Sequence, residues 1–137
     1  MINETFKNNL NSIGVELTDR QYEQFDMYYK LLVEWNSVMN LTGITDYEEV
    51  LLKHYVDSLV LDIEKIGHKK KEISLIDVGT GAGFPGLPLK IAHPQLNVVL
   101  LDSLNKRVKF LNQVIEELGL TGIETVHSRA EDGGRNN

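Results

Sequence analysis

The 137-residue chain is long enough for one domain, or for a small domain and part of another, and too short for a multidomain enzyme. Its composition, 42% hydrophobic and 25% charged with 11 glycines, excludes disordered and fibrous classes. Cysteine is absent, which excludes disulfides and thiol nucleophiles, and the net charge of −6 means that any nucleic acid must be bound by local basic clusters. The first residues lack a signal-peptide pattern and no apolar run suits a membrane helix, so we expect a cytoplasmic protein without a membrane partner.

The first half of the chain predicts helices. A short amphipathic segment ends at Gly14. Thr18 and Gln21 then form a capping box that opens a long helix, and this helix should end near Asn40. Its apolar stripe carries Phe25, Tyr28, Leu32, Trp35 and Met39. We interpret its aromatic residues as part of a core and not as a base-stacking platform, because they share one face.

A third helix is expected after a second capping box. Thr45 and Glu48 form this box, and the apolar periodicity runs on to Leu61. Residues 65–72 have no periodic apolar face and are predicted to be a hinge or linker. We therefore expect residues 1–72 to form a helical amino-terminal region with its linker.

The second half changes to short apolar runs that are typical of buried parallel strands. Strands are predicted at 73–78, 97–102 and 123–127, and helices at 85–94 and 104–118. This order of strands and helices is half of a doubly wound sheet. The fold class is therefore predicted to be α/β, with a helical region followed by a partial doubly wound, Rossmann-like parallel sheet over 73–137.

A glycine-rich motif follows the first predicted strand and opens a helix. Glycines alternate over residues 77–86, DVGTGAGFPG, so that a ligand can lie directly on the backbone. A glycine-rich turn without a ligand is the alternative. Asp102 favours a ligand, because it ends the second strand, 19 residues after Gly83, where a carboxylate can accept hydrogen bonds from both ribose hydroxyls of an adenosine.

Two adenosine cofactors fit this arrangement, and the motif favours one of them. In the frame that starts at Gly79, the third glycine position of a dinucleotide motif is occupied by Phe84. Pro85 and Pro88 also remove two backbone N–H groups that a pyrophosphate would need. S-adenosylmethionine has no phosphate, and its charged methionine tail suits an acidic strand end at Asp77. We therefore favour a methyltransferase over an NAD-dependent dehydrogenase.

Motifs along nearly the whole chain resemble the RsmG (GidB) family of bacterial 16S rRNA methyltransferases. In the second half these are DVGTGAGFPGLPL at 77–89, LLDS at 100–103, KRVKFL at 106–111 and SRAE at 128–131. In the first half they are WN at 35–36, NLT at 40–42, and His54 with DSL at 57–59. The resemblance implies a class I methyltransferase fold, S-adenosyl-L-methionine as cofactor, and methylation of guanine N7 in the 530 loop, with 16S rRNA or the small ribosomal subunit as partner. We expect no metal.

The predicted site residues come from the motif and from this resemblance, and no catalytic residue is named. The expected cofactor-binding residues are Asp77, Gly79, Gly81, Phe84, Asp102, Ala130 and Glu131. The resemblance places Asn40, His54 and Arg129 at the active site or RNA surface. Each of these three has a structural alternative: Asn40 as a helix end, His54 as a hydrogen-bond partner of Asp57, and Arg129 as a surface cation.

The strand count differs from the family pattern. The resemblance implies seven strands, whereas the sequence supplies three before the polar segment 131–137. We therefore expect a truncated chain in which the first and third strands have free edges. The alternative function is an inactive remnant that binds only the cofactor or RNA.

Overall fold

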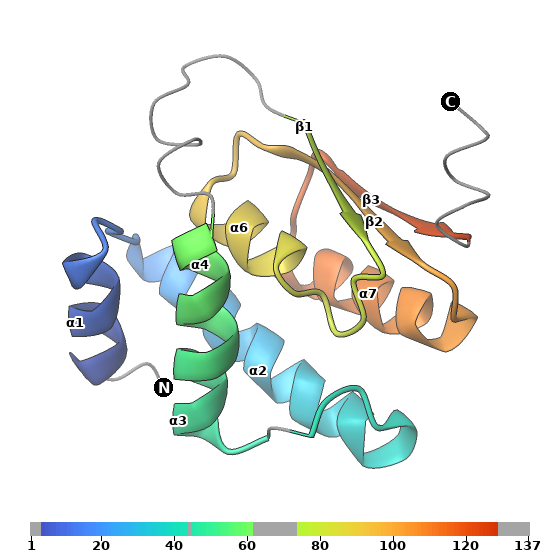
Figure 1. Ribbon diagram of the computed structural model, residues 1–137, viewed down its shortest axis with the longest axis horizontal. Helices are drawn as coiled ribbons and strands as arrows, with labels where there is room; N and C mark the ends of the chain where they lie inside the picture. Colours follow the sequence, from blue (N-terminus) through green and yellow to red (C-terminus); the bar gives the residue numbers. More distant parts are fainter. Residues whose placement is uncertain (1–3, 44, 62–73, 129–137) are drawn as a thin grey trace.

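The computed structural model describes residues 4–43, 45–61 and 74–128, and shows helices followed by a three-stranded sheet with two further helices (Figure 1). The first part consists of α1 (Glu4–Ser12), α2 (Asp19–Met39), α3 (Tyr47–Glu49), the π-helix η1 (Val50–Val56) and α4 (Asp57–Leu61). The second part consists of β1 (Ser74–Val78), α6 (Gly86–Ala92), β2 (Asn97–Asp102), α7 (Asn105–Leu118) and β3 (Ile123–His127). The predicted linker over 65–72 lies outside the described residues.

Helix α2 begins and ends as the sequence predicts. The Thr18 hydroxyl accepts a hydrogen bond from the Gln21 N–H at 3.2 Å, and the Gln21 side chain accepts one from the Thr18 N–H at 2.7 Å. Asn40 ends the helix in the left-handed conformation, with φ at +50°. The buried residues of α2 are Phe25, Tyr28, Leu31 and Leu32. The aromatic stripe is therefore core, as predicted.

The predicted cap of the third helix is wrong by one residue. Asp46, not Thr45, precedes α3, and its carboxylate accepts a hydrogen bond from the Glu49 N–H at 3.3 Å. The Thr45 carbonyl instead accepts one from the Tyr29 hydroxyl at 2.7 Å. Aspartate and threonine both cap helices well, so the sequence pattern alone did not separate the two neighbours.

The helix continues through a π-helical segment, η1, that the 3.6-residue period does not predict. Hydrogen bonds in a π-helix join residues five apart, so Val50 and Tyr55, like Leu51 and Val56, lie nearer to one face than they would in an α-helix. All four side chains are buried. The wider π-helical turn therefore directs all four apolar residues toward the core. A regular α-helix would distribute them around more of its circumference.

The sheet is parallel in the order β1-β2-β3, so the first and third strands lie at its edges, as predicted. Helices α2, α6 and α7 lie on one face of it (Figure 1). Asp77 and its register partner Leu100 are buried on that face. On the opposite face, where the described part of the chain places no helix, Ile76 and Val78 are 62% and 53% exposed.

Helix α2 joins the helical part to the sheet part. The Gln21 side-chain amide donates to the Ile91 carbonyl at 2.9 Å, and the Gln24 amide donates to the Leu118 carbonyl at 2.9 Å. These carbonyls belong to the last turns of α6 and α7, where no intrahelical partner is available. Buried residues of both parts form one hydrophobic core. The helical part is thus fixed directly against the helices that support the strand ends.

Candidate cofactor-binding site

The glycine-rich loop connects β1 to α6 and is held at its start by β2. The N–H groups of Gly79 and Thr80 donate to the Leu101 carbonyl at 2.8 and 3.2 Å. Gly79 and Gly81 have φ angles of +66° and +61°, a conformation that L side chains rarely adopt. A Cβ added at either glycine would meet no atom within 4 Å. This side of the loop backbone is therefore open to a ligand.

The other side of the loop is tightly packed. A Cβ at Gly83 would lie 2.6 Å from the Tyr28 hydroxyl oxygen. A Cβ at Gly86 would lie 2.5 Å from Leu100 Cδ2 and 2.8 Å from Asp77 Oδ2. These two glycines permit close packing against α2 and the sheet, whereas the first two permit the turn itself.

Asp77 organises the loop from its packed side. Its Oδ2 accepts hydrogen bonds from the Thr80 hydroxyl at 2.7 Å and from the Gly86 N–H at 3.0 Å, and the residue is 8% exposed. Burial raises the pKa of the Asp77 carboxyl, and the nearby Asp102 charge adds to this rise, although the two hydrogen bonds oppose it. This carboxylate therefore joins the end of β1 to the beginning of α6.

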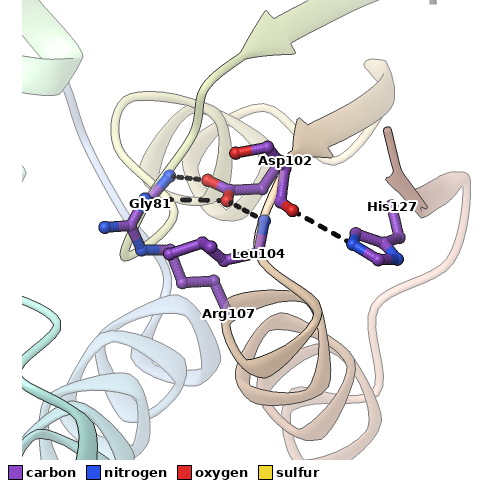
Figure 2. A network of polar contacts seen from close by, with 6 residues as sticks. Gly81, Asp102, Leu104, Arg107 and His127 are labelled. Atoms are coloured by element: carbon purple, nitrogen blue, oxygen red, sulfur yellow. Dashed lines mark hydrogen bonds and ion pairs between the residues drawn. The ribbon is translucent and has the colours of Figure 1, made fainter. Parts of the chain in front are cut away.

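Asp102 joins the loop to the start of α7 (Figure 2). Its Oδ2 accepts a hydrogen bond from the Gly81 N–H at 2.8 Å, and its Oδ1 accepts one from the Leu104 N–H at 2.9 Å. The guanidinium of Arg107 lies 3.6 Å from Oδ1. Asp102 is only 2% exposed, so these groups enclose its carboxylate. The predicted carboxylate is thus at the expected strand end and directly beside the glycine loop.

The end of β3 also lies beside Asp102. The Ser128 N–H donates to the Asp102 carbonyl at 2.9 Å. The His127 ring nitrogen Nε2 lies 3.0 Å from the Ser103 carbonyl (Figure 2). Three predicted site residues follow in the sequence and lie outside the described residues: Arg129, Ala130 and Glu131.

His54 of η1 reaches the loop from the helical part. Its ring is stacked on the ring of Phe84, with centroids 4.2 Å apart and an interplanar angle of 10°. Its Nε2 lies 3.0 Å from the Thr42 hydroxyl. Burial lowers the pKa of His54, and the charge of Asp57 only partly opposes this effect. His54 and Phe84, which the sequence analysis assigned to different ligands, are therefore direct neighbours.

Asn40 acts as the end of α2, which was the structural alternative for this residue. Its N–H donates to the Asn36 carbonyl at 3.1 Å. Two residues later, the Thr42 N–H donates to the Asn36 side-chain oxygen at 2.7 Å. The turn at Asn40 therefore brings Thr42 close to His54. Asn40 contributes to the site by setting the direction of the backbone.

Two residues that contact the loop were not identified from the sequence. Thr80 lies inside the glycine motif, three residues after Asp77, and its hydroxyl donates to the Asp77 carboxylate. Tyr28 donates a hydrogen bond from its hydroxyl to the Ala82 carbonyl at 2.6 Å. Its position in the apolar stripe indicated burial, but nothing in that pattern indicated a polar contact with a loop more than fifty residues away.

The described residues contain no group of three or more histidine, aspartate or glutamate side chains that could hold a metal ion. No helix among them has the length and apolar character needed to cross a membrane.

Comparison with known proteins identifies the family. Residues 21–137 match the family model of rRNA small subunit methyltransferase G. Relatives named ribosomal RNA small subunit methyltransferase G from Lachnoclostridium phytofermentans, Leuconostoc mesenteroides and Streptococcus thermophilus are 57%, 52% and 51% identical, over 97%, 99% and 98% of this chain. The chain spans only 54%, 57% and 56% of the length of these three relatives. The resemblance seen in the sequence motifs is thereby confirmed, and the chain belongs to the rRNA small subunit methyltransferase G family.

Proposed function

We propose that the chain is the cofactor-binding half of an enzyme that methylates guanine N7 in the 530 loop of 16S rRNA, with S-adenosyl-L-methionine as methyl donor. The observation that carries this proposal is the open side of the glycine loop beside Asp102. The relatives are named as methyltransferases of small-subunit rRNA, which supports the reaction class. The choice of guanine N7, of the 530 loop and of this donor depends on the sequence resemblance.

The residues at the strand ends fit an adenosine cofactor. Gly79 and Gly81 leave room above the loop backbone, and we assign Phe84 to the wall of the same site. We assign Asp102 to the ribose hydroxyls, because carboxylates accept two hydrogen bonds from vicinal hydroxyls well. Its oxygens contact Gly81 and Leu104 and it is almost fully buried, so we expect the Asp102 side chain to rotate and exchange its hydrogen bond with Gly81 for the ribose hydroxyls when a ribose binds.

The remaining predicted cofactor residues complete this assignment. Asp77 contributes by fixing the ends of the glycine loop, and its buried, hydrogen-bonded Oδ2 suits that task. Ala130 and Glu131 are proposed to border the adenine, as the resemblance implies. When bound, S-adenosylmethionine supplies a methyl group on a sulfonium centre.

The proposed reaction requires no general base from the chain. Guanine N7 carries a lone pair and no proton. The protein therefore has to align the base with the methyl group, a task of positioning. Burial lowers the pKa of His54, so at neutral pH its ring is uncharged and suited to stacking and hydrogen bonding. We propose His54, Asn40 and Arg129 as residues on the RNA side of the site.

A binding module that no longer transfers methyl groups is the second candidate. The observation that favours it is the exposed apolar face of the sheet, where Ile76 and Val78 lie on a surface that is usually covered in doubly wound folds.

A methyl-transfer assay distinguishes these two candidates. We would incubate labelled S-adenosylmethionine with unmethylated small ribosomal subunits or protein-free 16S rRNA, and either this chain or the full-length Lachnoclostridium phytofermentans relative. Chemical cleavage at 7-methylguanine locates the product. Transfer by this chain to guanine N7 in the 530 loop supports the enzyme. Cofactor binding without transfer, when the relative is active, supports the binding module, and modification of another base overturns the proposed substrate.

Calorimetry tests the cofactor separately. S-adenosylhomocysteine should bind this chain, whereas NAD should not, because Pro85 and Pro88 remove N–H groups that a pyrophosphate requires. Tighter binding of NAD than of S-adenosylhomocysteine would exclude the methyltransferase assignment.

A further inference from the structure

A hydrogen bond from the helical part fixes the centre of the glycine loop. The Tyr28 hydroxyl, on α2, donates to the Ala82 carbonyl at 2.6 Å. Tyr28 is 0% exposed and Ala82 is 5% exposed, so water does not compete for either group. This contact joins two segments that the sequence analysis placed in different regions of the protein.

The tyrosine ring is held by aromatic neighbours. It stacks on Tyr55 with centroids 5.4 Å apart, and lies 5.7 Å from the ring of Phe84 and 6.5 Å from that of Phe110. Tyr55 and Phe110 come from η1 and α7, so the ring is enclosed by different elements. A buried ring in such a setting keeps one rotamer, and its hydroxyl therefore has a fixed position.

The peptide group between Ala82 and Gly83, which accepts this hydrogen bond, is held on both of its sides. The Ala82 carbonyl accepts from Tyr28, and the N–H of the same peptide, on Gly83, donates to the Thr80 carbonyl at 3.0 Å. Because the carbonyl and N–H of a trans peptide point in opposite directions, the two contacts determine the orientation of the peptide plane. Gly83 has a φ of +103°, and a Cβ there would lie 2.6 Å from the Tyr28 oxygen.

We infer that Tyr28 is a positioning residue of the cofactor site, which sets the conformation of the glycine loop from its packed side. The inference rests on the proposed function, because it takes the glycine loop to be the cofactor-binding element. The hydroxyl fixes the Ala82 peptide, and the neighbouring Gly81 presents its open side to the ligand. A loop fixed before binding loses less conformational entropy when the ligand arrives. The helical part therefore takes part in cofactor binding.

The test removes this one hydroxyl and compares it with a matched buried tyrosine. Tyr28→Phe keeps the ring and loses the contact with Ala82. Tyr55→Phe is the control, because Tyr55 is equally buried and its hydroxyl donates to a helix carbonyl, that of Phe25, at 3.2 Å. Amide hydrogen exchange of residues 79–84 is measured without cofactor, and S-adenosylhomocysteine affinity is measured by calorimetry.

Tyr28→Phe should increase exchange in the loop and weaken S-adenosylhomocysteine binding, each by about fivefold, as expected for one lost hydrogen bond. Tyr55→Phe should leave both values near those of the unmodified chain. Equal effects of the two variants, or no effect of Tyr28→Phe, would overturn the inference. If Tyr28→Phe does not fold, exchange in the unmodified chain tests the inference: a Gly83 N–H that exchanges as fast as an unprotected amide, despite its hydrogen bond to the Thr80 carbonyl, would also overturn it.

The cofactor proposal can fail separately. If the unmodified chain does not bind S-adenosylhomocysteine, the proposed cofactor fails for this chain. The exchange comparison between Tyr28→Phe and Tyr55→Phe still decides whether Tyr28 sets the loop conformation.

Discussion

Asp102 connects the glycine loop to α7, so its replacement tests the proposed cofactor contact. Asp102→Ala removes an acceptor from the Gly81 and Leu104 N–H groups and from the proposed ribose hydroxyls. We expect S-adenosylhomocysteine binding to weaken by about 1.5 to 3 kcal/mol, because hydrogen bonds to a charged acceptor are lost. Isothermal calorimetry on the folded variant measures this change.

The control for Asp102 is a second carboxylate at a helix start. Asp46 accepts a hydrogen bond from the Glu49 N–H at the start of α3, whereas the glycine loop lies between β1 and α6. Asp46→Ala should lower stability through the lost cap and leave cofactor affinity unchanged. Unchanged affinity in a folded Asp102→Ala variant would show that the ribose binds elsewhere.

His54 makes a prediction about pH. Burial lowers its folded pKa below the ordinary value of about 6.5. Its contribution to the free energy of unfolding is thus fully present above pH 6.5, and is lost as the pH falls through the lower folded pKa, because the unfolded chain binds the proton more readily. His54→Phe keeps a ring against Phe84 but cannot titrate. In urea unfolding at pH 7.5 and pH 5.0, the unmodified chain should lose more stability than this variant, and equal losses would contradict the assignment.

At the scale of elements, the packing of α6 on the sheet depends on Gly86. A methyl group there would press on Leu100 Cδ2 at 2.5 Å and on Asp77 Oδ2 at 2.8 Å. Gly86→Ala should therefore lower the free energy of unfolding by about 1 to 3 kcal/mol, the usual range for an overpacked core. Gly43→Ala is the control, since a Cβ at Gly43 meets no atom within 4 Å. Urea unfolding that shows equal stability for both variants would refute this packing argument.

The elements that follow local rules were predictable from the sequence. The strand expected at 97–102 is β2, Asn97–Asp102, and the strand expected at 123–127 is β3, Ile123–His127. The capping box of α2 also formed as expected. By contrast, the π-helical turns of η1 depend on which residues the core can receive, and the hydrophobic period of a single segment does not contain that information.

The position of the candidate site was predictable, but its internal contacts were not. Asp77 and Asp102 were both assigned to the cofactor, and parallel strands end at the same edge of a sheet, which places the two residues at one site. The hydrogen bond from the Gly81 N–H to Asp102 depends on the loop conformation. The contact between Tyr28 and Ala82 depends on how α2 packs across α6 and α7. The spacing of residues along the sequence does not indicate such long-range contacts.

At the scale of the whole molecule, the charge distribution restricts where RNA can bind. The net charge of −6 repels a polyanion at a distance. The first turn of α7, however, has no acidic side chain and carries Lys106 and Arg107 beside the end of β2. A helix amino terminus is itself partly positive, so Lys106 adds to the helix dipole there, whereas Arg107 is paired with Asp102. RNA that enters the proposed site should therefore contact this turn, next to the glycine loop.

The salt dependence of RNA binding tests this placement. Few phosphates can be neutralised, so affinity for a 16S rRNA fragment should fall only gently with salt, by a slope of about −0.7 per phosphate on single-stranded RNA. Lys106→Ala should make the slope shallower by about 0.7, because it removes one exposed cation beside the site. Lys7→Ala is the control, since Lys7 lies on α1, away from the ends of the strands (Figure 1). Fluorescence titrations across a salt series give both slopes. If Lys7→Ala reduces the slope and Lys106→Ala does not, RNA follows the helical part of the chain and not the turn beside the glycine loop.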